Sequence, residues 1–184
     1  MIPGMGTMNG QASCDDNVVG DGRISRADIL CAIGLSILAM LIWWQYSAPI
    51  ARDMGIYLYG GEALLRGEMP YVDVFDVKPP LTFLAGALVA ALKNASGFSM
   101  FVCNRIVLEL FAAGAVFFTY LLAKRLTGKN LWAILSAIVL LSFTGVGWLG
   151  GPPKILVMVT SVAGLFSLER NRLITAGTCF GLAS

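Results

Sequence analysis

Most side chains of this sequence that can do chemistry lie in one polar segment, residues 52–78. The 184-residue chain has 13 Lys or Arg and 11 Asp or Glu residues, and eight of them fall within this segment. It directly follows residues 29–51, an uncharged stretch long enough to cross a bilayer core of about 30 Å. Charged groups just beyond a membrane span lie at the water interface, where they stay hydrated and can meet lipid-borne substrates. We therefore expect any chemistry to take place in the polar segment.

Asp53 is the first candidate, because it follows the apolar stretch at the depth of a lipid headgroup. The sequence has no histidine, so acid–base work falls to carboxylates, lysine or tyrosine. An aspartate with an ordinary pKa is ionised near neutral pH and can accept a proton. The alternative is structural, since aspartate is a favoured N-cap and we expect a helix to begin just after it. The two roles are compatible.

Asp73, Asp76 and Lys78 form a second cluster of charged residues. The plain interpretation of the two carboxylates is a solvated loop. Lys78 precedes an apolar run and therefore lies at the interface. A lysine there can bind phosphate, or it can merely anchor a helix by extending toward water. The sequence leaves both roles open.

Arg105 and Glu109 lie four residues apart in an apolar stretch and so share one face of a helix. Ionisable residues in membrane segments are functional candidates by default. If the helix begins near Met100, however, Arg105 can simply reach the interface. The pair would also suit a small transporter, but a transporter needs polar residues that recur through several spans, and the sequence shows this pair alone.

The elements that hold these residues are expected to be helical and largely apolar. Hydrophobic residues make up 57% of the chain and charged residues 13%, against about 25% in soluble domains. We therefore expect an all-α, multi-pass membrane helical bundle of four to six segments in the plasma (inner) membrane. Nucleic-acid binding has no support, because there is no soluble basic domain. The four cysteines show no close pairing and are not expected to form disulfides or to bind metal.

The expected organisation is a disordered tail, residues 1–28, followed by a membrane domain, residues 29–184. Within that domain we expect a first span at 29–51, an external loop at 52–78 and further membrane segments at 79–184. In the external loop, the spacing of Tyr57, Gly61, Leu64 and Leu65 predicts an interfacial helix over Met54–Arg66. Gly67 supplies its C-terminal stop, and the Pro79–Pro80 pair restarts a helix.

The orientation of the chain is ambiguous in the sequence. Arg23 and Arg26 precede the first span and favour a cytoplasmic N-terminus. The basic cluster that begins at Lys124 would also prefer the cytoplasm. If 79–92 and 100–123 both crossed completely, however, that cluster would lie outside. Because the run 79–92 is short, it can instead lie in the interface.

Four ordered motifs follow the first apolar stretch. They are Asp53-Met54-Gly55-Ile56-Tyr57, Leu64-Leu65-Arg66-Gly67, Pro70-Tyr71-Val72-Asp73 and Asp76-Val77-Lys78-Pro79-Pro80-Leu81. Together they resemble the N-terminal signature of the membrane glycosyltransferases of the C superfamily, within them the protein O-mannosyltransferase and lipid A aminoarabinose transferase group. The resemblance extends over about residues 29–150, and Arg105 is similar to an arginine common shortly after this loop in the family.

This resemblance implies an enzyme that moves a sugar from a polyprenyl-phosphate carrier to an acceptor hydroxyl at the external membrane face, as in protein glycosylation of the cell envelope. It implies that Asp53 is the catalytic base and that Lys78 and Arg105 neutralise the departing phosphate. The remaining residues implied to bind substrate are Tyr57, Asp73 and Asp76. Expected partners are the lipid-linked donor and membrane lipids. No cofactor is expected, although the resemblance leaves a divalent metal open.

Two positions depart from the family pattern. Met54 stands where an acidic residue often follows the aspartate, and residues 151–154 stand where relatives usually carry an acidic second motif. Such enzymes also have many more membrane segments, so we expect this chain to be the N-terminal portion of a transferase core. Whether it acts as an enzyme as given is left open. The alternative is an inactive fragment or a non-catalytic multi-pass membrane protein.

Overall fold

The computed structural model describes residues 23–44, 52–69, 71–73, 80–147 and 152–183, and this part of the chain contains helices and no strand. The prediction of an all-α helical bundle is therefore confirmed. The helices are α1 (Arg26–Trp44), α2 (Arg52–Leu65), α3 (Pro80–Ser96), α4 (Met100–Thr127), α5 (Asn130–Gly147), α6 (Pro152–Glu169) and α7 (Leu173–Ala183).

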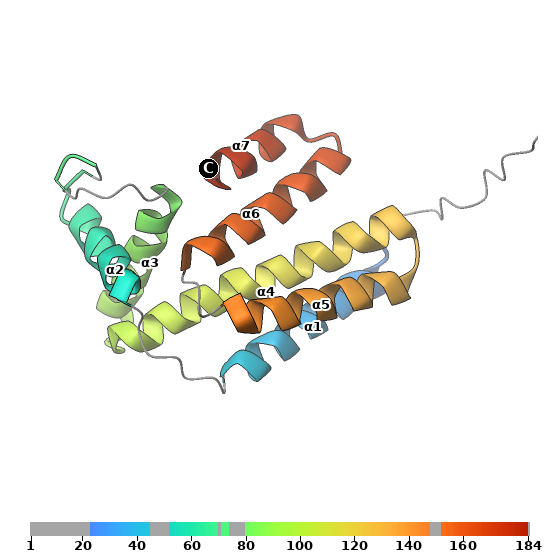
Figure 1. Ribbon diagram of the computed structural model, residues 1–184, viewed down its shortest axis with the longest axis horizontal. Helices are drawn as coiled ribbons and strands as arrows, with labels where there is room; N and C mark the ends of the chain where they lie inside the picture. The colour runs from blue at the N-terminus through green and yellow to red at the C-terminus, as the bar shows by residue number, and fades with distance from the viewer. Residues whose placement is uncertain (1–22, 45–51, 70, 74–79, 148–151, 184) are drawn as a thin grey trace, which may run out of the picture.

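The longest helix, α4, is the centre of the bundle. Helices α1, α5 and α6 pack along it, while α7 packs on α6. Helices α2 and α3 form a separate pair, which stands at the end where α4 begins (Figure 1). Of the candidate residues, Asp53 and Tyr57 therefore lie on a short helix near the start of α4, and Arg105 lies on α4 itself.

Local sequence signals explain where the helices begin and end. Helix α2 ends at Leu65, and Gly67, two residues later, has a φ of 88°, in the left-handed region that favours glycine. The N–H of Gly67 donates to Leu64 O at 3.0 Å, and the N–H of Glu68 donates to Ala63 O at 3.1 Å. The predicted helix and its glycine stop are thus confirmed. Its start differs slightly, because α2 begins at Arg52 and Asp53 lies in its first turn rather than before it.

The interior of the bundle is built from small residues, which let helix backbones approach closely. Ser36 Oγ donates to Ala113 O at 3.0 Å and so joins α1 to α4. Large apolar side chains of α1, such as Leu30 and Leu41, are exposed on the outside. The fully buried alanines where α1, α4 and α5 meet are Ala32, Ala39, Ala112, Ala133 and Ala137.

Among the described helices, α4 is the one that is both long and apolar enough to cross a membrane, and half of its most apolar window is buried in the bundle. A core helix of a soluble protein can have the same length and composition, so α4 alone does not show a membrane span. The predicted first span, 29–51, is described only as far as Trp44, where α1 ends.

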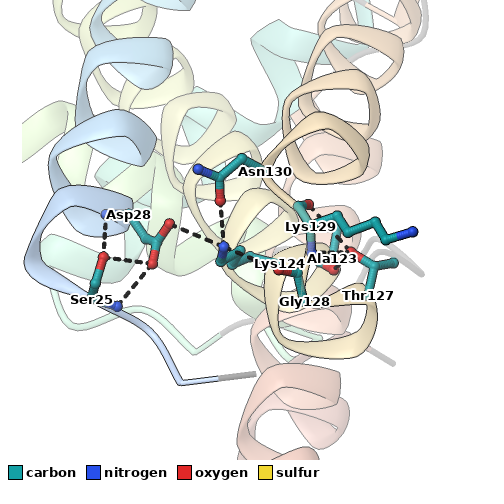
Figure 2. A network of polar contacts seen from close by, with 8 residues as sticks. All are labelled: Ser25, Asp28, Ala123, Lys124, Thr127, Gly128, Lys129 and Asn130. Carbon is teal, nitrogen blue, oxygen red and sulfur yellow. Dashed lines mark hydrogen bonds and ion pairs between the residues drawn. The ribbon is translucent and has the colours of Figure 1, made fainter. Parts of the chain in front are cut away.

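One end of the bundle gathers the basic residues that the sequence left in conflict. Asp28, near the start of α1, lies 3.6 Å from Lys124, near the end of α4, so these helices run in opposite directions (Figure 2). Arg125, also near the end of α4, pairs with Glu169 at the end of α6. We call this the basic end; its cations are Arg23, Arg26, Lys124, Arg125, Lys129, Arg170 and Arg172.

The position of the helix pair α2–α3 bears on the conflict in helix counting. Helix α3 packs on α2 and meets α4 near its start, where Val89 of α3 clusters with Cys103 and Val107 (Figure 1). It is not one of the helices that run along α4. Lys124 can therefore lie at the same end of the bundle as Arg23 and Arg26.

Candidate functional site

The candidate site lies where the first turn of α2 meets the second turn of α4. Asn104 Nδ2 donates to the sulfur of Met54 at 3.0 Å, and both side chains are buried. These residues are 50 positions apart in the sequence. Their contact places the backbone of Asp53, next to Met54, near Arg105, next to Asn104. Two of the predicted site residues are thus brought to the same junction, although the side chain of Asp53 lies outside what the structure describes.

Arg105 and Glu109 form a buried ion pair at this junction. Arg105 Nε donates to Glu109 Oε1 at 3.0 Å, and the two residues are 8% and 1% exposed. The predicted shared helix face is confirmed. The Arg105 side chain is enclosed by the protein, and the alternative that it reaches the membrane interface stays a prediction. A buried cation is costly unless a partner is held against it, and Glu109 supplies that partner.

Helix α2 is fixed by a direct backbone contact with α3. A Cβ on Gly61 would lie 2.1 Å from the carbonyl carbon of Gly86, and a Cβ on Gly86 would lie 2.2 Å from the carbonyl oxygen of Tyr57. No other residue type allows the two helices to approach this closely. The Tyr57 side chain is buried beside the crossing. Of the residues on the predicted shared face of this helix, Tyr57 and Gly61 are buried, whereas Leu65 is half exposed.

Replacing Gly61 with alanine should loosen or displace α2. The added methyl group collides with backbone rather than with a flexible side chain, and such overpacking costs about 1–3 kcal/mol or more. Gly55→Ala is the matched control in the same helix, because a Cβ there meets nothing within 4 Å. Thermal unfolding and amide exchange of α2 would be measured for Gly61→Ala and Gly55→Ala. Equal stability of the two variants would contradict the close backbone contact between Gly61 and Gly86.

Asp73 has a different place and a structural partner. Its Oδ2 accepts a hydrogen bond from the N–H of Met69 at 2.8 Å, and its own N–H donates to Met69 O at 3.0 Å. The residue is exposed and lies in the turn that follows the C-terminal end of α2, away from Asp53. Nearby, the Tyr71 ring packs edge-on against Phe83 with centroids 5.6 Å apart. The carboxylate thus orders a loop, as the plain interpretation suggested.

Asp76 and Lys78 lie outside the described residues. Within the described ranges, no group of three or more His, Cys, Asp or Glu residues could hold a metal ion. Sequence reasoning missed Asn104 and Gly86, because neither stands out in an apolar run. Their roles appear only once α2 is seen against α3 and α4.

Comparisons with known proteins give one informative similarity. The chain is 26% identical over 127 residues to a protein of Haloferax volcanii described as a dolichol phosphate-mannose mannosyltransferase. The matched region covers 66% of this chain, and the chain spans 27% of the length of that relative. No family model matches the chain. No solved structure matches it either.

Proposed function

We propose that the chain is part of a glycosyltransferase that moves a sugar, mannose by analogy with the Haloferax volcanii relative, from a polyprenyl-phosphate carrier to an acceptor hydroxyl. The observation that carries the proposal is the Met54–Asn104 contact, which brings the segment of Asp53 to the segment of Arg105. A base and a cation at one junction suit a reaction that removes a proton and releases a phosphate.

In the proposed reaction, Asp53 takes the proton of the acceptor hydroxyl as its oxygen attacks the anomeric carbon. A new bond forms between that oxygen and carbon, and the bond from the carbon to the phosphate oxygen breaks. The polyprenyl phosphate leaves with the electron pair, and the configuration of the anomeric carbon is inverted. Arg105 and Lys78 offset the charge of the phosphate, while Tyr57, Asp73 and Asp76 are assigned to substrate binding by the resemblance alone.

The distribution of polar groups supports a membrane location. The bundle buries Asn104, Arg105 and Glu109 and exposes large apolar side chains, including Ile37 and Leu41 on α1. An extended apolar exterior is unusual for a soluble monomer and suits contact with lipid. In this proposal the basic end faces the cytoplasm, and the α2–α3 pair with the candidate site lies at the external face.

Cysteine labelling tests this orientation. In a chain whose native cysteines are replaced by alanine, Val72→Cys should react with a membrane-impermeant maleimide in intact cells, because Val72 is 76% exposed and lies beside α2. Leu126→Cys at the basic end is the matched control and should react only after permeabilisation. The reverse pattern would contradict the proposed orientation.

Binding of the lipid carrier tests the function. The full-length protein, purified in mild detergent, should bind polyprenyl-phosphate-mannose, and Lys78→Gln should weaken that binding markedly because the charge is lost while much of the stem remains. Lys78→Arg should recover part of it. Equal binding by all three forms would show that Lys78 only anchors a helix. Failure of the unaltered protein to bind the carrier would favour a non-catalytic membrane protein.

A further inference from the structure

We propose that the basic end is a docking surface for an anionic lipid membrane face. Seven of the 13 Lys and Arg residues of the chain converge there, although they come from four separate parts of the sequence. Two lie before or at the start of α1, two lie in the last turn of α4, one lies in the connection between α4 and α5, and two lie just after α6. The fold, rather than any single basic run, makes this surface.

The carboxylates at this end are already engaged with inner cations. Lys124 Nζ lies 3.6 Å from Asp28 and also donates to Asn130 Oδ1 and to Gly128 O, the latter at 3.3 Å (Figure 2). Asp28 in turn accepts hydrogen bonds from the Ser25 N–H at 2.8 Å and the Ser25 hydroxyl at 2.7 Å. Burial alone would raise the pKa of Asp28, but these donors together hold it below its ordinary value, so the carboxylate stays charged for Lys124.

The outer cations remain exposed. Arg26, Lys129 and Arg172 are on the surface and have no carboxylate partner among the described residues. Arg170 is also exposed, and its guanidinium lies 5.3 Å from the centre of the Phe166 ring, a contact that leaves its charge uncancelled. With Asp28 and Glu169 paired inside, the described residues give the outer surface of this end a positive charge.

Exposed apolar side chains adjoin these cations, which favours lipid over a nucleic acid or an acidic protein. Leu30 lies one turn beyond Arg26, Leu131 lies two residues after Lys129, and Ile174, 88% exposed, lies two residues after Arg172. Side chains in this order match a membrane boundary, where cations sit at headgroup depth and apolar groups enter the acyl layer. A partner bound by charge alone would not bury these exposed apolar side chains.

The strength of such docking follows from the number of cations. Each Lys or Arg near an anionic surface strengthens binding about fivefold, and the effect is screened within about 10 Å at ordinary salt. Removal of Lys129 and Arg172 together should therefore weaken the preference for anionic lipid about 25-fold. The effect should vanish at high salt.

The test compares lipids of different charge with the full chain in mild nonionic micelles. Adding phosphatidylglycerol should raise the midpoint of thermal unfolding more than adding phosphatidylcholine does, and Lys129→Gln/Arg172→Gln should lose most of that difference. Arg66→Gln/Lys93→Gln is the matched control, because it removes two cations from the α2–α3 pair, and it should keep the difference even if its own midpoint falls.

The proposal would be overturned if the two double variants showed the same difference in unfolding midpoint between phosphatidylglycerol and phosphatidylcholine. It would also be overturned if the unaltered protein showed no such difference. Inorganic phosphate or a short RNA that reproduced the phosphatidylglycerol effect would also overturn it, since the lipid surface would then be unnecessary. None of these outcomes depends on sugar transfer.

Discussion

Glu109→Ala is expected to destabilise the bundle by about 3–5 kcal/mol, because it removes the buried carboxylate that is held against the cation of Arg105. A group that is 8% exposed cannot recover its hydration without opening the helix junction. Unfolding of the purified protein in mixed micelles, followed by loss of helical circular dichroism, would measure the change.

Glu62→Ala is the matched control for this prediction. Glu62 also pairs with a cation, Lys93, at 2.9 Å. Both side chains of this pair are more than one-third exposed, Glu62 at 35% and Lys93 at 41%. Exposed pairs of this kind contribute about 0–1 kcal/mol. If Glu109→Ala cost no more than Glu62→Ala, the buried pair would not be important for stability.

A double replacement separates the stability of the pair from its function. Arg105→Met/Glu109→Leu removes both charges together, and apolar replacements of a buried pair are often neutral or stabilising. The double variant should therefore fold much better than Glu109→Ala. It should nevertheless bind the polyprenyl-phosphate carrier poorly, because the proposed phosphate-binding cation is gone.

Helix boundaries were predictable from the sequence because they depend on neighbouring residues. Gly67 ends α2 through its left-handed backbone, and Pro80 begins α3, as expected of residues with those conformational preferences. The shared face of Arg105 and Glu109 followed from helical spacing alone. In each case the controlling contacts lie within a few residues.

The junctions between helices were not predictable in the same way. Nothing in the local sequence selects Gly86 as the partner of Gly61, since each occurs in a stretch with other small residues. The Met54–Asn104 contact likewise joins segments that are distant in the chain. Such pairings depend on how whole helices pack, and they decide which candidate residues meet.

The distance between the carboxylates of the polar segment, residues 52–78, could not be predicted from the sequence either. The resemblance implied different roles for Asp53 and Asp73, but it gave no distance between them. In the structure, α2 separates the turn of Asp73 from the junction near Arg105. A helix of 14 residues is about 20 Å long, so its two ends are too far apart to act on one reacting group.

Loss of the base should have the largest effect on the reaction. Asp53→Asn keeps nearly the same size and shape but cannot accept the proton of the acceptor hydroxyl, so transfer should fall about 10²–10⁴-fold. Carrier binding should change much less, since the carboxylate acts on the acceptor rather than on the phosphate. Glu68→Gln is the matched control, because it also removes one carboxylate charge, at a surface position beside Arg66.

The most direct measurement is therefore mannose transfer from polyprenyl-phosphate-mannose by membranes that contain the full-length transferase of which this chain is proposed to be a part, with the unaltered form, Asp53→Asn and Glu68→Gln present in equal amounts. The proposed function predicts transfer by the unaltered form and by Glu68→Gln, and its loss in Asp53→Asn. Near-normal transfer by Asp53→Asn, or no transfer by the unaltered protein, would contradict it.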